Sequence, residues 1–488
     1  MERRFSGVEK ASIEFALCMA LMAFLAGFVL PKRTAAQVVG GTLLGTVTDP
    51  SGALVPNVEV IMKNTATGVV TTVATNSQGL YSAPNLLPGN YQVTFSCKGF
   101  TTEVRTGIVL TVGAQQVLNV AMRVGDVSQV IQVTGAPPIV QLASSTISAN
   151  VNATTVRELP LNGRSWTDLA TLQPGITSIH AIVSTAHGPD RIGRGLGAQV
   201  SITGGRPQDD NYLVNGITIN DFANGTPGSV IGTNLGVDAV QEFSILTTNY
   251  SAEYGRTSGG VVSAITRSGT NAFHGNVYEF LRNSSLDAAN FFDNFSNSTI
   301  PEFRRNQFGA SAGGPIQKDR TFIFGDYEGL RQALGVSQVD TVPSLAARSG
   351  VLSTGTVTVD RSVAPFLSFY PLPNGPIIAP GDTAVFAFGS PSVASENYGI
   401  IRMDHTFSNK DSMDGTYTYD AASSSQPDEF NNKLVFNGSR RQLVTLEETH
   451  IFNPSMVNTL RLGVNRVHAA APQNATAINS LAASTALG

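Results

Sequence analysis

The residues after position 272 most constrain the fold, because tight and long connections alternate between short candidate strands. A tilted membrane strand needs about 9 to 11 residues. Seven segments of about that length lie at 274–282, 303–313, 320–331, 396–407, 412–420, 441–452 and 456–467. The connections at 314–319, 408–411 and 453–455 are tight and polar, whereas those at 283–302, 332–395 and 421–440 are long. Short turns on one side and long loops on the other are typical of outer-membrane barrels, so we predict a wall of antiparallel membrane strands.

Two of these segments also alternate between an apolar and a polar face, as a strand between two environments must. Met413, Gly415, Tyr417 and Tyr419 oppose Ser412, Asp414, Thr416, Thr418 and Asp420, and Leu460, Leu462 and Val464 oppose Thr459, Arg461, Gly463 and Asn465. The other five alternate less cleanly. Phe322 and Phe324, for example, share a face with Asp326 and Glu328.

The first 36 residues are typical of an export signal. Arg3, Arg4 and Lys10 precede an apolar run from Phe15 to Leu30, and small residues at 34–36 suit cleavage before Gln37. An uncleaved anchor is the alternative, but the apolar run is shorter than the roughly 20 residues of a spanning helix.

Cys97 is then the single cysteine of the mature chain, which excludes an internal disulfide.

Composition and motifs exclude several function classes. Only 14% of the 488 residues are charged and the net charge is −4, which gives no basic surface for nucleic acid. The six histidines are scattered, with no metalloprotease or serine-hydrolase motif around them. We therefore predict no enzyme activity, no cofactor, no metal site and no nucleic-acid partner.

Residues 38–123 read as a small β-sandwich of about seven strands separated by turn signals. In the clearest strand Tyr91, Val93, Phe95 and Cys97 share one face, which predicts a core position for Cys97.

Between 139 and 271 the pattern mixes helix and strand. A capping box at Ser165–Asp168 predicts one short helix. Strands are expected at 200–203, 211–214 and 242–247, and Asn215-Gly216 predicts a tight turn. Glycines bracket an apolar run at 261–265, which predicts a buried strand. We interpret the polar run from Asp209 to Asn211 as turn capping rather than a metal site.

Several stretches resemble one known family. GTVTDPSGALVPNVEV and LYSAPNLLPGNYQVTF resemble the carboxypeptidase-regulatory-like fold, and ELPLNGRSWTDLATLQPGI, QDDNYLVNGI and NYSAEYGRTSGGVVSAITRSGTNAFHG resemble the plug and plug-to-barrel junction of TonB-dependent outer-membrane receptors. RRNQFGASAGGPIQKDRTFIFGDYEGLR resembles the first barrel hairpin of the Oar-like group of these receptors.

The resemblance implies a mainly β chain with five parts. They are a signal peptide at 1–36, a β-sandwich at 38–123, a connector at 124–138, a small α+β plug at 139–271, and the first strands of a transmembrane antiparallel β-barrel at 272–488. It implies location in the outer membrane with the N-terminal domain in the periplasm, and ligand transport driven by a TonB-type energy-coupling protein. The partners would be that protein, outer-membrane lipid, and a carbohydrate, peptide or metal chelate as the transported ligand.

Seven strands cannot close the roughly 22-stranded barrel of a plugged transporter. A barrel of about eight strands fills its own interior and leaves no room for a plug. We therefore expect the sequence to be a fragment of a longer product, with a decayed gene as the alternative.

Two sets of site residues follow from position. In the family the connector carries the TonB box, and Val130, Ile131, Gln132 and Val133 match it loosely; an ordinary last strand of the sandwich explains the same residues equally well. Long outer loops commonly bind ligands, so we place ligand contact at 332–395, with Phe366, Phe369 and Tyr370, and at 182–199. The alternative function is a secreted β-domain adhesin or structural surface protein.

Overall fold

The computed structural model describes residues 40–134, 146–159, 161, 163–179, 199–221, 224–255, 257–288, 300, 302–453, 456–470 and 476–483. The expected signal peptide and nearly all of the candidate ligand segment 182–199 lie outside the described residues. Among the helices that the structure describes, none is long and apolar enough to cross a membrane.

The first part of the chain is a sandwich of two sheets. One sheet has the order β4-β1-β7, with β8 also paired to β1, and the other has the order β3-β2-β5-β6-β9. The strands are β1 (Gly41–Thr48), β2 (Glu59–Asn64), β3 (Val70–Ala74), β4 (Leu80–Leu86), β5 (Gly89–Ser96), β6 (Thr102–Leu110), β7 (Gln115–Val117), β8 (Val120–Ala121) and β9 (Val130–Thr134). Tyr91, Val93 and Phe95 are buried in the core, as their alternation predicts, and Cys97 packs partly buried against it.

The second part, residues 146–271, is called the plug module below. Its main sheet has the order β10-β15-β16-β13-β14, and β11 pairs with β12 beside it. The elements are β10 (Ile147–Val151), α2 (Ala153–Glu158), η1 (Trp166–Leu172), β11 (Ile176–Ile179), β12 (Gln199–Ile202), η2 (Pro207–Asp209), β13 (Asn211–Val214), β14 (Ile217–Thr218), β15 (Val240–Thr248) and β16 (Val261–Thr266). The predicted tight turn is confirmed, because Asn215 and Gly216 adopt φ of 48° and 76° between the antiparallel β13 and β14.

The predicted buried strand is β16, all of whose residues are buried. Its bracketing glycines are needed for close packing. A Cβ on Gly260 would lie 2.5 Å from the Ile202 side chain, and one on Gly259 would lie 3.0 Å from the backbone of Asp209. The strand therefore passes directly against β12 and the turn before β13.

The short helix predicted after Ser165 is present, but the predicted capping box at Ser165–Asp168 is wrong. The segment forms η1, a 3₁₀ helix, and Ser165 makes no side-chain cap. Its hydroxyl bonds instead with the Thr167 hydroxyl, at 3.0 Å. Because both residues are buried, their side chains satisfy each other rather than the helix end. The helix α2, capped by Asn152, was not predicted.

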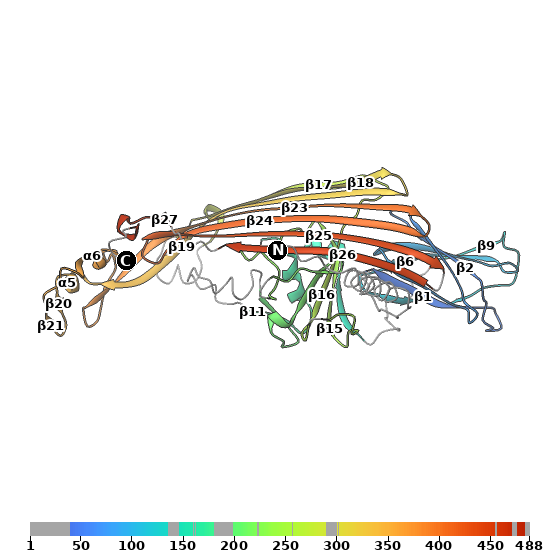
Figure 1. Cartoon of the computed structure of the whole chain (residues 1–488), viewed down its shortest axis with the longest axis horizontal. Coiled ribbons are helices and arrows are strands. Elements are labelled where there is room, and N and C mark those ends of the chain that lie inside the picture. The colour runs from blue at the N-terminus through green and yellow to red at the C-terminus, as the bar shows by residue number, and fades with distance from the viewer. Residues whose placement is uncertain are drawn as a thin grey trace, which may run out of the picture. The chain divides into compact units, whose positions relative to one another are not determined.

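The third part is a nine-stranded antiparallel sheet. Its seven long strands, called the wall below, pair in chain order (Figure 1), and the short strands β22 and β27 pair with β23 and β25. They are β17 (His274–Asn283), β18 (Phe303–Gln317), β19 (Thr321–Pro343), β23 (Thr383–Ser408), β24 (Asp411–Pro427), β25 (Lys433–Asn453) and β26 (Met456–Ala470). Short elements between and after them are η3 (Ser284–Leu286), α5 (Leu345–Arg348), β20 (Val351–Leu352), β21 (Gly355–Thr356), α6 (Ala364–Leu367), β22 (Ile377–Ile378), β27 (Thr476–Ala477) and η4 (Ser480–Ala483).

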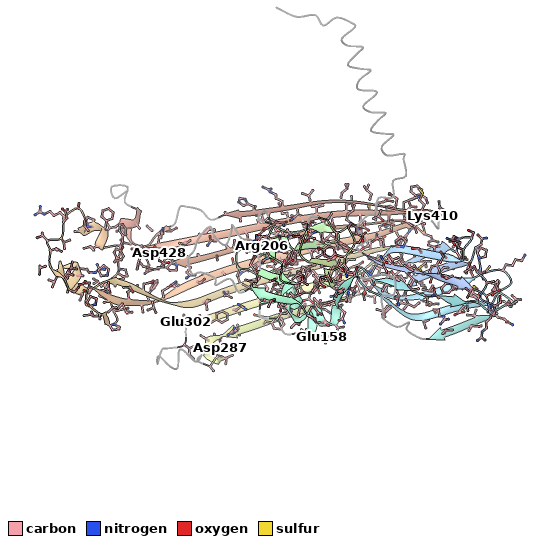
Figure 2. The ribbon with its side chains drawn as sticks, turned by 90° about the horizontal axis from the view of Figure 1, so that it is seen from below. Glu158, Arg206, Asp287, Glu302, Lys410 and Asp428 are labelled. Carbon is pink, nitrogen blue, oxygen red and sulfur yellow. The ribbon has the colours of Figure 1, made fainter. Side chains whose placement is uncertain are left out.

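All seven predicted wall strands are present, but their predicted lengths are wrong except in β17. The other six strands have 15 to 26 residues rather than about 9 to 11, so two of the expected long connections are shorter than predicted. The connection expected at 421–440 shrinks to 428–432, since β24 and β25 stay paired from Asp411–His450 to Pro427–Leu434. The one expected at 332–395 shrinks to 344–382. The sequence does not reveal these longer strands, because small polar residues such as Ser423 and Ser424 give no apolar face. The backbone pairing nevertheless continues through them. Figure 2 shows Lys410, in the tight turn before β24, and Asp428, in the turn after it, at opposite ends of the wall.

The two faces of the wall differ as predicted. Leu460, Leu462 and Val464 are 54%, 57% and 65% exposed on the outward face. On the inward face Asn465 donates to the Asn220 carbonyl of the plug module at 3.1 Å. The plug module therefore lies against the inward face of the wall.

Candidate functional site: the contact between plug module and wall

Three groups of buried polar side chains join the plug module to the wall. The first is centred on Arg164, which follows Gly163 and precedes η1. Its Nε lies 3.0 Å from Glu328 Oε1 on β19, and its Nη2 bonds the Asp238 carboxylate before β15. Glu328 and Asp238 are 0% and 2% exposed, so Arg164 is the cation that compensates both charges, and Asp238 also accepts from Asn276 Nδ2 on β17 at 2.7 Å.

Neighbouring residues make further contacts with Glu328 and Arg164. Glu328 also accepts from Gln307 Nε2 on β18 at 2.8 Å and from the Gly236 amide at 3.1 Å. The Arg164 guanidinium lies 4.1 Å from the centre of the Tyr278 ring on β17. Burial alone would lower the pKa of Arg164, but Glu328, Tyr278 and Asp238 raise it overall, so Arg164 stays charged.

The second group fixes the end of the plug module, where β16 leads into β17. Arg402 on β23 is 1% exposed, and its Nη1 donates to the carbonyl and hydroxyl oxygens of Thr266 at 3.0 Å each. Its Nη2 lies 2.7 Å from Asp404 Oδ1. Asn215 Nδ2 donates to Thr266 Oγ1 at 2.9 Å and to Thr416 Oγ1 on β24 at 3.1 Å. The tight Asn215-Gly216 turn therefore carries an amide that bonds the wall.

The third group holds the plug loop 225–234. Arg441 Nη2 on β25 donates to the Gly228 carbonyl at 2.9 Å, and the Val230 amide donates to Ser439 Oγ at 3.0 Å. Thr233 donates its hydroxyl proton to Glu396 on β23, which is fully buried. The loop is thus held by β23 and β25 together.

Inside the plug module, Asp210 is the carboxylate that the sequence assigned to turn capping. Its Oδ1 accepts from the Gly260 amide at 2.8 Å, so it joins the turn before β13 to the start of β16. It is 1% exposed, and among the described residues its Oδ2 has no hydrogen-bond partner. Burial raises the pKa of Asp210 from 3.8 to about 7.

We predict that the stability of the plug module falls as pH rises from about 4 to about 7. In that window the folded Asp210 keeps its proton while the unfolded residue loses it, so the unfolded state binds fewer protons. Above about pH 7, Asp210 is ionised in both the folded and the unfolded state, and its contribution to the stability of the plug module is lost. Burial likewise raises the pKa of Glu242 to about 7, so both residues contribute to the slope.

The measurement is urea unfolding followed by the fluorescence of Trp166, the chain's single tryptophan, at pH 5 and pH 8. The Asp210→Asn variant should show a smaller difference between the two midpoints than the parent protein. An unchanged difference would show that Asp210 does not titrate in this window.

The predicted partner residues Val130, Ile131, Gln132 and Val133 lie in β9, which pairs in parallel with β6 at the edge of its sheet. Val130 is 63% exposed. The predicted ligand residues Phe366, Phe369 and Tyr370 lie in and just after α6, in the connection between β19 and β23. The Tyr370 ring packs 5.2 Å from the Phe430 ring, in the β24–β25 turn.

Sequence reasoning missed the charged contacts of the plug module. A usable signal was present in β19, where Asp326 and Glu328 share a face with Phe322 and Phe324. Both phenylalanines are buried on the inward face, so that face carries packing residues as well as charges. An inward face that touches a plug module need not be uniformly polar.

The chain matches three family models. They are "Carboxypeptidase regulatory-like domain" at residues 42–123, "TonB-dependent Receptor Plug Domain" at 141–262 and "Outer membrane beta barrel domain" at 265–488. It is 30% identical over 308 residues to the TonB-dependent transporter Oar of Myxococcus xanthus, covering 60% of this chain and 27% of that protein. The chain thus spans about a quarter of the length of this curated relative.

Solved structures that resemble the chain include the outer membrane transporter YddB from Escherichia coli and the siderophore receptor PiuA from Acinetobacter baumannii. YddB aligns with a TM-score of 0.43 at 14% identity, covering 66% of this chain and 39% of YddB. PiuA aligns with a TM-score of 0.37 at 14% identity, covering 68% of this chain and 47% of PiuA.

A plug module against a wall of antiparallel strands, behind a regulatory-like sandwich, defines the class of plugged outer-membrane receptors. The chain belongs to the TonB-dependent outer-membrane receptors that carry an N-terminal carboxypeptidase-regulatory-like domain, and its sequence is similar to that of the Oar transporter. It is located in the outer membrane, with the sandwich and plug module on the periplasmic side. The family is one of transporters and receptors rather than an enzyme class, and the adhesin alternative is not favoured.

Proposed function

We propose that this protein acts as a TonB-dependent transporter, which moves a ligand across the outer membrane with energy coupled from the inner membrane. The observation that carries the proposal is the buried charged contact of Arg164 with Asp238 and Glu328. The free energy gained when two buried charges pair is largely offset by the cost of removing both charges from water. A plug module held in this way can be released once water enters, and no covalent chemistry is needed.

Mechanical coupling would act through the segment Val130–Val133. As β9 it lies at the edge of its sheet, with β6 on one side. An edge strand can accept a further strand, which is how an extended segment commonly binds a partner domain. A periplasmic TonB-type domain would add a strand to this edge and pull on the chain that leads to the plug module.

Ligand contact would involve the connection between β19 and β23. Phe366 and Tyr370 expose 46% and 40% of their surface there. Arg348 holds this connection by donating to the carbonyls of Leu367 at 2.8 Å and Pro371 at 2.7 Å, and Asn432 Nδ2 donates to the Phe369 carbonyl at 2.6 Å. Exposed aromatic rings on an anchored loop suit the apolar faces of a carbohydrate, a peptide or a metal chelate.

The experiment is capture of a TonB-type periplasmic domain by the purified chain. We expect Ile131→Pro to reduce capture at least tenfold, because proline removes a backbone donor from the strand. Ile131→Ala keeps that donor and should retain most of the capture. Equal capture by both variants would contradict a role for this segment, and no capture by the parent protein would contradict the proposed function.

A further inference from the structure

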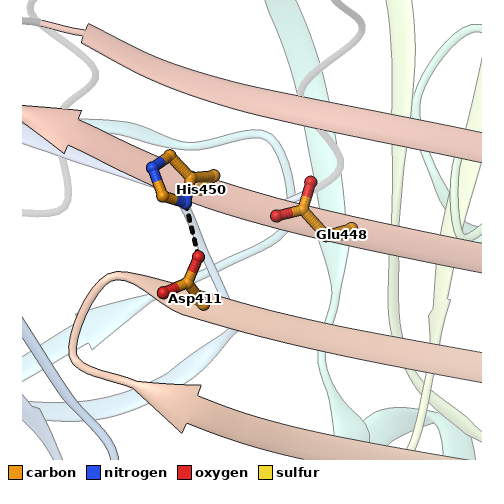
Figure 3. A group of neighbouring side chains, drawn as sticks. All are labelled: Asp411, Glu448 and His450. Carbon is orange, nitrogen blue, oxygen red and sulfur yellow. Dashed lines mark hydrogen bonds and ion pairs between the residues drawn. The ribbon is translucent and has the colours of Figure 1, made fainter.

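A histidine and two carboxylates gather on the outward face of the wall, at the end with the tight turns. Asp411 begins β24 directly opposite His450 on β25, and Glu448 precedes His450 by two residues on the same face (Figure 3). One ligand atom from each residue lies within 4.8 Å of the other two. Asp411 Oδ1 bonds His450 Nδ1, and the two side chains are 37% and 32% exposed. Tight turns face the periplasm in outer-membrane barrels, so the cluster is at the periplasmic rim.

Glu448 lies between two apolar neighbours on the wall. Its neighbours in register are Met413 on β24 and Leu460 on β26. Among the described residues it has no hydrogen bond or ion pair, and Lys410, in the adjacent turn, forms no ion pair with it. A half-exposed carboxylate without a protein partner is free to bind a cation as one of its ligands. Its nearest candidate ligand partners are Asp411 and His450.

We propose that Asp411, Glu448 and His450 form a binding site for a divalent transition-metal cation of the Zn²⁺ type. One imidazole nitrogen and two carboxylate oxygens are a donor set that Zn²⁺ accepts, with water in the fourth position. Metal–ligand bonds of about 2.0 to 2.2 Å require the three donor atoms to draw closer by side-chain rotation. The cation would replace the hydrogen bond between Asp411 and His450 and would join β24 to β25.

The wall contains a matched control for this site. His405 on β23 precedes Phe407 by two residues, as His450 precedes Phe452, and each imidazole packs edge-on against its phenylalanine. His405 bonds the Thr321 hydroxyl at 2.8 Å, and its neighbour in register on β24 is Met413. His405 therefore shares the local sequence and the rim position but lacks the carboxylates.

The test is titration of the purified full chain, in detergent, with Zn²⁺ and with Co²⁺. We expect one Zn²⁺ per chain at micromolar concentration, reversal by a chelator, and the visible absorption of four-coordinate Co²⁺. His450→Ala and Glu448→Gln should each weaken Zn²⁺ binding at least tenfold, whereas His405→Ala should leave it unchanged. Mg²⁺ at equal concentration should not compete, because it prefers oxygen donors.

Three results would overturn the proposal. They are an absence of Zn²⁺ binding by the parent chain up to millimolar concentration, equal binding by the parent chain and His450→Ala, and loss of binding in His405→Ala alone. The Co²⁺ spectrum of the parent chain does not depend on any variant, so it remains informative if a variant fails to fold. A spectrum without the bands of a nitrogen- and oxygen-coordinated Co²⁺ site excludes the cluster.

Discussion

Replacing Arg164 by alanine is expected to lower the free energy of unfolding of the plug module by about 3 to 5 kcal/mol. The variant leaves Asp238 and Glu328 buried without their cation, and the fully buried Glu328 keeps only Gln307 and the Gly236 amide as donors. Trp166 lies two residues away in the buried part of the module, so denaturant unfolding can be followed by its fluorescence in the intact chain.

Arg282 provides the matched control for this substitution. It pairs with Asp287 at 3.2 Å, but its side chain is 52% exposed. Exposed pairs contribute roughly 0 to 1 kcal/mol, so Arg282→Ala should leave the unfolding midpoint nearly unchanged. Equal effects of the two variants would show that burial at the plug–wall contact does not set the strength of the Arg164 interaction.

Replacing Phe243 by alanine is expected to cost about 3 to 5 kcal/mol through the cavity it leaves in the plug core. Phe243 lies on β15, is 0% exposed, and packs with its ring centre 5.2 Å from that of Trp166. The denaturant midpoint reported by Trp166 fluorescence should fall accordingly, and the emission of the folded state should shift because the tryptophan loses its neighbour.

Phe273 serves as the control for a phenylalanine deletion, since it is 84% exposed just before β17. Phe273→Ala should change the free energy of unfolding by no more than about 0.5 kcal/mol. A small effect of Phe243→Ala would mean that the plug module does not have the tightly packed core described above.

The parts of the fold set by local pattern could be predicted. The presence and order of the wall strands follow from the spacing of the tight turns, although the strand lengths do not. The β13–β14 turn follows from Asn215-Gly216, where both residues need positive φ. The buried β16 follows from an apolar run between glycines that permit close approach. The turn and the buried strand are each read from residues that lie in or beside the element that they predict.

The plug–wall contact could not be predicted in the same way, because its partners are far apart in the sequence. Arg164 is 74 residues from Asp238 and 164 residues from Glu328. Ser165 shows the same limit, since its sequence neighbourhood favours a capping box while burial directs its hydroxyl to Thr167. Such side-chain contacts depend on which residues become buried together in the tertiary structure, and the neighbouring sequence does not predict this.

The most direct test of the account is the accessibility of spin labels along β25, placed singly at Leu443, Val444, Thr445 and Leu446 in protein reconstituted into lipid. Val444 and Leu446 are 45% and 40% exposed on the outward face, whereas Leu443 and Thr445 are each 3% exposed on the face that meets the plug module. We expect labels at 444 and 446 to collide freely with oxygen dissolved in lipid and labels at 443 and 445 to collide with neither oxygen nor a water-soluble reagent. Equal collision at all four positions, or access of the water-soluble reagent to 444 and 446, would contradict a lipid-facing wall that carries the plug module on its inner side.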